Sequence, residues 1–425
     1  MCVYIFLLLY VSQVSGSRLA GLRLQLGSAP LMTKEQVCSK SHVEVSVSSR
    51  MDKKTNRRLL ISWWVPQVES ADMIALYVTD PEVNLTSPVF TLSPSSTSGW
   101  SHTPLSETYL NYRDTFIPQC LGYWVIYWRG FEKVASSCLQ THPTWMWDHR
   151  DQLGRFRMTE LFLPGTHDSA AYSVSFEARE LTRFEKYVFT QEESVLSQLI
   201  HGVRYLDIRL GHHKNEGFYT HHGFVKLRHF QGVIDDVIVF LNNSRDIIIL
   251  DLHHFPVGFK TQDVHHQLVK YIEDQLSEYM VTPALSWYST LNDIWKTGKQ
   301  LIVSYNNQAV VARGTHKLWY PVRHQWADTK KLDSLKTFLD SVMRKRPLGA
   351  WAAMAELTPD RWDVLLDSAG GLRTMAADTN IMVTEWFRGA WGVKCNIVAV
   401  DFIRGSGIVN AAIQWNLKKA FNLCM

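Results

Sequence analysis

Nearly continuous apolar runs recur in the second part of this chain, and they restrict its fold more than any other feature. Examples are residues 246–252, 300–305 and 395–401, and stretches long enough for helices separate them. Strands that are apolar on both faces belong to parallel sheets that helices cover on both sides. The pattern therefore predicts an α/β fold over residues 146–425, a (β/α) barrel of the TIM type. Thr190-Gln191-Glu192-Glu193 fits a capping box that opens one of its helices.

The first part of the chain has a different period. Between about residues 40 and 140, short runs alternate apolar and polar side chains, and turn-rich stretches such as 92–99 separate them. Regular short strands with turns are typical of β-sandwiches. We therefore predict a small all-β sandwich domain over residues 17–145. A docking role and a purely structural role are both open for it.

The start of the chain predicts secretion. Residues 1–11 are apolar, and the small-residue stretch Val14-Ser15-Gly16 follows, so residues 1–16 are expected to be a signal peptide. A buried first strand is the alternative, because the segment lacks an early Lys or Arg. No later stretch is long and apolar enough to span a bilayer. A secreted, extracellular glycoprotein is expected, and sequons at Asn84 and Asn242 fit this.

The cysteines favour disulfides over a metal site. Without the leader, five remain, and none shows metal-ligand spacing: Cys38, Cys120, Cys138, Cys395 and Cys424. In an oxidising compartment, Cys120 and Cys138 could pair across two neighbouring strands. Cys395 and Cys424 could close the C-terminal end. The odd number leaves one thiol free or intermolecular.

Charge argues against one class of partner. The chain has 44 basic and 40 acidic residues, a net charge of +4, and no long basic block. A dedicated nucleic-acid binder is therefore not expected. Mild basicity fits contact with an anionic lipid surface, though only weakly.

Titratable side chains follow several of the predicted strands. In a barrel, the active site lies at the carboxyl ends of the strands. The residues expected there are two histidines, an arginine and three aspartates: His167, His222, Arg209, Asp207, Asp251 and Asp401. This set suits cleavage of a phosphodiester without a metal, because one imidazole can take a proton, the other can give one, and a guanidinium can hold the phosphate charge. The pairs 212–213 and 265–266 are expected to be solvated histidines.

Four segments that contain these residues resemble, nearly residue for residue, the X-box of phosphatidylinositol-specific phospholipases C. They are residues 163–169, 202–209, 221–223 and 247–252. The resemblance extends over roughly residues 146–425 and is strongest before residue 260. The chain looks most like the animal X-domain-containing proteins, which lack C2, EF-hand and Y-box segments.

The resemblance implies a role for each catalytic candidate. His167 would be the general base on the inositol 2-hydroxyl, and His222 the general acid for the diacylglycerol oxygen. Arg209 would contact the phosphate. The products in such enzymes are diacylglycerol and a cyclic inositol phosphate.

Three carboxylates would support these groups. By the same resemblance, Asp168 and Asp207 would orient and charge-balance the histidine and the arginine. Asp401 is similar to the late carboxylate that pairs with the base.

One departure separates the branches of the family. Calcium-dependent relatives carry His-Asn in the first motif and Glu-Leu-Asp in the second, whereas this chain has His167-Asp168 and Asp207-Ile208-Arg209. A guanidinium, which is permanently charged and forks toward phosphate oxygens, would repel calcium. The site therefore resembles the metal-independent bacterial type, and neither a metal nor a cofactor is expected.

Two further residues are candidates for substrate contact. His253 falls where bacterial members carry a basic residue and calcium-dependent members a metal-binding glutamate, and a structural role for it is equally open. Tyr305, at the end of the run 300–305, is the second candidate.

Three functions remain in view. The first is a secreted, metal-independent phosphodiesterase that acts at a peripheral membrane surface on phosphatidylinositol or on glycosyl-phosphatidylinositol anchors. The second is a lipid- or partner-binding protein with a vestigial site. The third is another barrel phosphodiesterase, such as a glycerophosphodiesterase, which relies on a metal held by carboxylates. Arg209 argues against the third.

Overall fold

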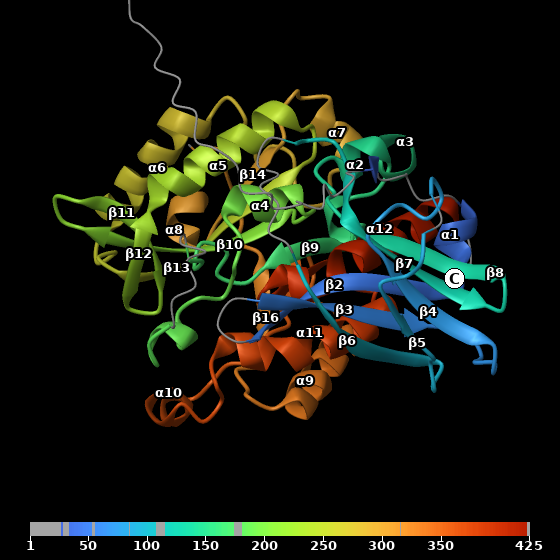
Figure 1. The fold of residues 1–425 in the computed structure, drawn as a ribbon. Coiled ribbons are helices and arrows are strands. Elements are labelled where there is room, and N and C mark those ends of the chain that lie inside the picture. The colour runs from blue at the N-terminus through green and yellow to red at the C-terminus, as the bar shows by residue number, and fades with distance from the viewer. Residues whose placement is uncertain are drawn as a thin grey trace, which may run out of the picture.

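The structure is a computed structural model that describes residues 27–28, 34–52, 56–84, 86–107, 115–173, 181–314 and 316–422. The predicted signal peptide and Cys424 lie outside these residues. A curled parallel sheet with its helices forms one part of the molecule, and antiparallel sheets of the N-terminal segment lie against it (Figure 1). In the part of the chain that the structure describes, no helix has the length and apolar character needed to cross a bilayer.

The parallel sheet has the form of a TIM-type barrel that stays open at one place. Its strands are β9 (Leu163–Thr166), β10 (Tyr205–His213), β13 (Ile248–Val257), β14 (Leu301–Tyr305), β15 (Leu318–Trp319), β16 (Arg323–Trp326), β17 (Trp351–Met354) and β18 (Ile397–Val400). They follow in the order β15-β14-β13-β10-β9-β18-β17-β16, and each neighbouring pair is parallel. Within the described residues, no ladder joins β15 to β16. The predicted α/β fold of barrel type is confirmed.

The long helices cover the sheet because they present apolar faces to it. In α5 (Phe230–Asn243), Phe230, Val233, Val237 and Phe240 are buried at helical spacing. The other long helices are α6 (Gln262–Leu276), α9 (Leu332–Arg344), α11 (Leu372–Arg388) and α12 (Ile408–Phe421). The shorter ones are α1 (Lys34–Cys38), α2 (Trp145–Asp148), α3 (Arg150–Leu153), α4 (Val195–Ile200), α7 (Leu291–Trp295), α8 (Gln308–Val311) and α10 (Arg361–Leu366).

The predicted capping box at residues 190–193 is wrong. Helix α4 begins at Val195, and its N-cap is Ser194, whose hydroxyl accepts a hydrogen bond from the Ser197 amide at 3.2 Å. The hydroxyl of Thr190 instead donates to the carbonyl of Asp168 at 2.9 Å. Because Thr190 is hydrogen-bonded to a neighbouring loop, it does not cap the helix, and Ser194 does so instead.

Two antiparallel sheets build the N-terminal part. One contains β2 (His42–Asp52), β3 (Asn56–Trp64) and β6 (Ser98–Ser106). The antiparallel strands β11 (Gly217–His222) and β12 (Val225–His229) do not belong to this part, because they extend the barrel sheet from β10. The other contains β1 (Gly27–Ser28), β4 (Asp72–Tyr77), β5 (Phe90–Leu92), β7 (Gln119–Arg129) and β8 (Glu132–Gln140). Alternate residues of both sheets, among them Val45, Ile61, Leu76 and Val125, form one buried apolar cluster. That residues 17–145 are a separate sandwich domain stays a prediction.

The cysteines follow the sequence prediction only in part. Cys120 and Cys138 are disulfide-bonded between β7 and β8, with Cα atoms 5.6 Å apart. Cys395 is a buried free thiol whose Sγ donates to the carbonyl of Gly392. The predicted pairing of Cys395 with Cys424 is therefore wrong. Cys38, for which no pairing was predicted, is disulfide-bonded. Cys395 packs within the apolar core of the barrel, where its thiol has no partner sulfur.

Candidate active site

The predicted catalytic side chains meet at the carboxyl ends of three neighbouring strands. They come from β10 and from the loops after β9 and β18: His167, Asp168, Asp207, Arg209 and Asp401. Strand β9 is hydrogen-bonded to β10 on one side and to β18 on the other. Residues far apart in sequence are thereby placed side by side.

His167 lies between a carboxylate and a guanidinium. Its Nδ1 is 2.8 Å from Oδ1 of Asp401, and its Nε2 is 2.5 Å from Nη2 of Arg209. A guanidinium has only donors, so Nε2 must accept and Nδ1 must carry the proton that it donates to Asp401. Burial lowers the pKa of His167, an effect that Glu356 opposes and Arg209 increases. The ring is therefore neutral, with its basic nitrogen facing Arg209.

Two buried aspartates hold Arg209. Its Nη2 is 3.4 Å from Oδ2 of Asp207, and its Nε is 3.7 Å from Oδ2 of Asp168. Burial alone would raise the pKa of Asp207, but the cationic groups around it, Arg209 first and His324 next, together outweigh burial and lower the pKa to about 2. Burial raises the pKa of Asp168 well above its usual range. The Arg209 side chain stays 21% exposed, so a phosphate can reach it.

His222 faces the base from β11. Its ring centroid is 6.4 Å from that of His167, with the rings nearly perpendicular. Burial, followed by the charges of Arg209 and His167, lowers the pKa of His222 to about 3. In the free protein this imidazole is therefore neutral at neutral pH.

The neighbouring His221 points to the other side of the strand. It is fully buried, and its ring stacks on His213 at a centroid distance of 5.1 Å. A Cβ atom at Gly211 would lie 2.3 Å from its Nε2, so the close packing of this ring requires glycine at that position. The alternation along β11 separates the roles of the two histidines.

A second group, Asp251, His253 and His324, borders this site. Asp251 is the register partner of Asp207 on the adjacent strand. Its Oδ2 is 3.3 Å from Nδ1 of His253 and 3.1 Å from Nε2 of His324, and it also accepts from the hydroxyl of Tyr205 at 2.6 Å. Ligand atoms of the three residues lie within 4.8 Å of one another, the spacing of a metal site.

The two histidines of this group contact Asp251 differently. Their rings are stacked with planes 6° apart. Nε2 of His324 is hydrogen-bonded to Asp251, whereas Nδ1 of His253 lies at ion-pair distance from it and makes no hydrogen bond in the described structure. The predicted substrate contact His253 is thus at the edge of the site and held by a buried carboxylate.

Tyr305, the other predicted substrate contact, is not brought to the site. It is fully buried, and its hydroxyl is hydrogen-bonded to Nδ1 of His265 in α6 at 2.7 Å. The side chain fills the space between sheet and helix. His265 is correspondingly buried, so the expectation that residues 265–266 are both solvated is wrong for His265.

Glu356 belongs to the site and was not predicted. It follows β17, is 4% exposed, and neither of its carboxylate oxygens has a hydrogen-bond partner in the described structure. Burial raises its pKa to about 7. The apolar run 350–355 ends in this carboxylate, which is the same signal that identified Asp207. His324 and Tyr205 were also missed: no motif marks His324, and Tyr205 lies within the segment 202–209 without having been singled out.

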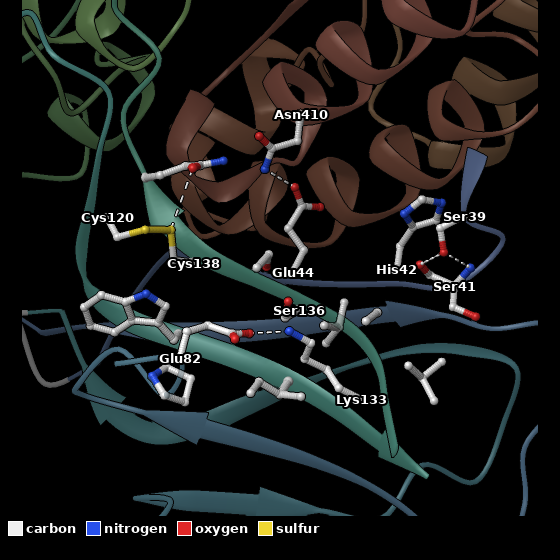
Figure 2. Close-up of a pocket in the computed structure, with 18 of the residues that line it drawn as sticks. Ser39, Ser41, His42, Glu44, Glu82, Cys120, Lys133, Ser136, Cys138 and Asn410 are labelled. Atoms are coloured by element: carbon white, nitrogen blue, oxygen red, sulfur yellow. Dashed lines mark hydrogen bonds and ion pairs between the residues drawn. A yellow bond between two sulfur atoms is a disulfide. The ribbon is translucent and has the colours of Figure 1, made fainter. Parts of the chain in front are cut away.

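A cavity of about 480 Å³ lies elsewhere, between β2, β8 and the side chains of α11 and α12 (Figure 2). None of the catalytic candidates lines it. Its charged groups are already paired, Glu44 with Arg388 and Asn410, and Lys133 with Glu82. The cavity is not the candidate active site.

Comparisons with known proteins agree with this site and fold. No family model matches the chain. It is 28% identical to human PI-PLC X domain-containing protein 1 over 310 residues, which cover 66% of this chain and 94% of the human protein. The mouse protein of the same name is 27% identical over 314 residues, covering 67% of this chain and 89% of the relative.

The fold resembles that of a bacterial enzyme. A Staphylococcus aureus phosphatidylinositol-specific phospholipase C superposes with a TM-score of 0.50 and 17% identity, covering 64% of this chain and 97% of that one. At this identity the likeness concerns the fold. Over about two thirds of its length, the chain is similar in sequence to the PI-PLC X domain-containing proteins.

Proposed function

We propose that this protein is a phosphodiesterase of the phosphatidylinositol-specific phospholipase C type, and that it cleaves phosphatidylinositol or glycosyl-phosphatidylinositol without a metal ion. One observation carries the proposal: a neutral imidazole, His167, presents its basic nitrogen to the guanidinium of Arg209, with His222 opposite. The names of the relatives support the same class of reaction. Incubation of the purified protein with phosphatidylinositol tests it, and a cyclic inositol phosphate is the expected product.

The geometry supports a two-proton mechanism. When the bound phosphate takes over Nη2 of Arg209, Nε2 of His167 is freed and accepts the proton of the inositol 2-hydroxyl, and that oxygen forms a bond to phosphorus. The bond from phosphorus to the diacylglycerol oxygen breaks as His222 protonates the leaving oxygen. Arg209 holds the phosphoryl oxygens while charge develops on them. Asp401 accepts the Nδ1 proton of His167 in a hydrogen bond and stabilises the imidazolium that forms.

The position of Arg209 supports the proposed metal independence. Its guanidinium lies against Asp168 and Asp207, the carboxylates that a cation would otherwise use. It supplies a fixed positive charge and a planar pair of donors to the phosphate. An added divalent cation at the same carboxylates would be repelled.

An apolar rim supports contact with a membrane surface. Helix α10, in the loop region after β17, exposes Trp362, Leu365 and Leu366 at 56%, 50% and 70%. Arg183, in the loop region after β9, donates to the carbonyl of Leu365 at 3.1 Å. Loops that follow the carboxyl ends of barrel strands surround the active site. Apolar side chains beside cations there suit a bilayer that contains anionic lipid.

Replacing Trp362 and Leu366 together with Ala should weaken binding to vesicles of phosphatidylcholine and phosphatidylinositol about tenfold or more, because about 25 cal/mol is lost per Å² of apolar area that no longer enters the bilayer. Vesicle sedimentation measures the binding. Turnover of a short-chain, monomeric substrate should be unchanged. An equal loss on both substrates would contradict a docking role for α10.

The pH dependence should differ between free and bound protein. The pKa of His222 is lowered to about 3 by burial and by Arg209, and catalysis needs this ring protonated, so kcat/KM should fall as pH rises through that low pKa. A bound phosphodiester offsets the charge of Arg209 and raises the pKa of His222. The alkaline limb of kcat should therefore lie at higher pH than that of kcat/KM. Coincident alkaline limbs in the two profiles would count against His222 as the acid.

We also propose that the protein acts outside the cell. The apolar leader at residues 1–16 and the Cys120–Cys138 disulfide support this. An extracellular site makes anchored glycans a natural substrate, since the anchor's lipid faces outward.

A further inference from the structure

Two residues in an unusual backbone conformation flank the catalytic base and its carboxylate. Asp168, which follows His167, has φ 35°, and Phe402, which follows Asp401, has φ 48°. The left-handed region is unfavourable for a side chain as large as phenylalanine. Such residues keep this conformation only where the surrounding structure holds them.

Residues 190 and 191 hold both of these turns. Thr190 donates from its hydroxyl to the carbonyl of Asp168 at 2.9 Å, and its own carbonyl accepts from the amide of Phe402 at 2.8 Å. The side-chain amide of Gln191 donates to the carbonyls of His167 and Val400 at 3.1 and 2.9 Å. The short segment 190–191 thereby joins the loop that carries the base to the loop that carries its carboxylate.

The next two residues fasten this segment to the N-terminal part of the molecule. Glu192 and Glu193 are ion-paired with Arg57 of β3 at 3.1 and 3.6 Å. Arg57 also pairs with Glu107 at 2.8 Å, and Arg404 pairs with Glu193 at 2.9 Å.

All five side chains of this ion cluster are nearly inaccessible. Their exposed fractions are 9% or less. Buried ions that lose a partner are strongly destabilised where they stand, so the cluster fixes the place of residues 192–193 more firmly than surface ion pairs do. Residues 190–193 therefore connect this ion cluster to the two turns at Asp168 and Phe402.

We propose that Arg57 is a positioning residue for the catalytic pair, acting through residues 190–193 on His167 and Asp401. The inference rests on the proposed phosphodiesterase reaction. The N-terminal part of the chain is then a component of the active site's framework. A displacement of the base by a fraction of its hydrogen-bond length lowers the rate of proton transfer without removing any group that touches substrate.

Arg57→Ala should lower kcat on phosphatidylinositol by about tenfold and leave KM within about twofold, because alignment and not substrate contact is lost. Arg57→Lys, which keeps the charge, should restore part of kcat. Glu192→Gln is a milder variant for use if Arg57→Ala does not fold, and a severalfold drop in kcat is expected from it.

Arg388→Ala is the matched control. Arg388 is also a largely inaccessible arginine, with its side chain 10% exposed, and it joins α11 to β2 through Glu44 and makes no ion pair with residues 190–193 in the described structure. It should lower the free energy of unfolding, as Arg57→Ala does, with kcat close to that of the unmodified protein. Equal losses of kcat in the two variants, or full kcat in Arg57→Ala, would overturn the proposal.

A readout that needs no turnover separates this proposal from the proposed function. In nitrogen-15 spectra of histidine-labelled protein, Arg57→Ala should shift the Nδ1–H resonance of His167, which reports its bond to Asp401, and Arg388→Ala should not. A shift in a protein without activity would reject the function and keep the positioning role. An unshifted resonance in Arg57→Ala would reject the positioning role.

Discussion

His167→Ala and His222→Ala should each slow cleavage of phosphatidylinositol by on the order of 10²–10⁴, the usual worth of a positioned acid or base. The two rings lie 6.4 Å apart on opposite sides of the space beside Arg209. Each variant removes one of the two proton transfers and leaves the phosphate contact in place. The loss should therefore appear in kcat more than in KM, as measured by steady-state kinetics on mixed micelles.

His221→Ala is the control for this pair. Its ring is buried against His213 on the other face of β11 and touches no catalytic candidate. It should lower stability and leave kcat within a few fold of the unmodified protein. A loss as large as that of His222→Ala would mean that the wrong histidine of the pair has been assigned as the acid.

Arg209→Lys should reduce kcat by on the order of 10²–10³, the range found when one preorganised donor to a developing oxyanion is removed. The substitution keeps one positive charge but removes the planar fork, and its ammonium cannot contact Asp168, Asp207 and a phosphate at the same angles. The partner of Nε2 in His167 is lost as well. Single-turnover rates on a water-soluble substrate measure the chemical step.

A loss smaller than tenfold in Arg209→Lys would show that charge alone is sufficient at this position. Arg204→Lys provides a contrast: Arg204 is fully buried, is paired with Asp246 and immediately precedes the same strand. It should lower stability and leave the chemical step unchanged in the folded fraction.

The sequence was sufficient to predict the sheet and the place where most of the candidate site residues come together, since both follow from one pattern. Apolar runs mark buried parallel strands, and a titratable residue at the end of a run is placed at the carboxyl edge where β9, β10 and β18 meet. His167, Asp207 and Arg209 are next to one another for this reason. Glu356 has the same signal. It was missed because the run before it, residues 350–355, consists mostly of alanine and is less clearly apolar than the other runs.

The contacts of residues whose role depends on the orientation of the side chain could not be predicted from the sequence. Tyr305 ends its strand, yet its ring faces α6, because strand alternation assigns faces only once the register is known. Cys395 and residues 190–193 failed for a related reason. Spacing suggested a disulfide and a helix cap, whereas tertiary packing gave the thiol an apolar surrounding and gave the polar segment two loops to hold.

The alternating N-terminal strands were predictable, and their contacts with the barrel were not. Val45 and Ile61 show the period of a sheet with one buried face. Nothing in that period indicates that Arg57, on the same strand as Ile61, would reach Glu192 across 135 positions of sequence. Buried ion pairs between distant segments leave no periodic trace.

Product identity in the presence of a chelator tests the central claim most directly. Purified protein is incubated with phosphatidylinositol in EDTA and, separately, in calcium, and the water-soluble product is followed by phosphorus-31 spectroscopy. A metal-free reaction by His167, His222 and Arg209 predicts a cyclic inositol phosphate that forms at the same rate in both. A tenfold slower reaction in EDTA, equivalent to about 1.4 kcal/mol of transition-state stabilisation, or the absence of a cyclic product, would contradict it.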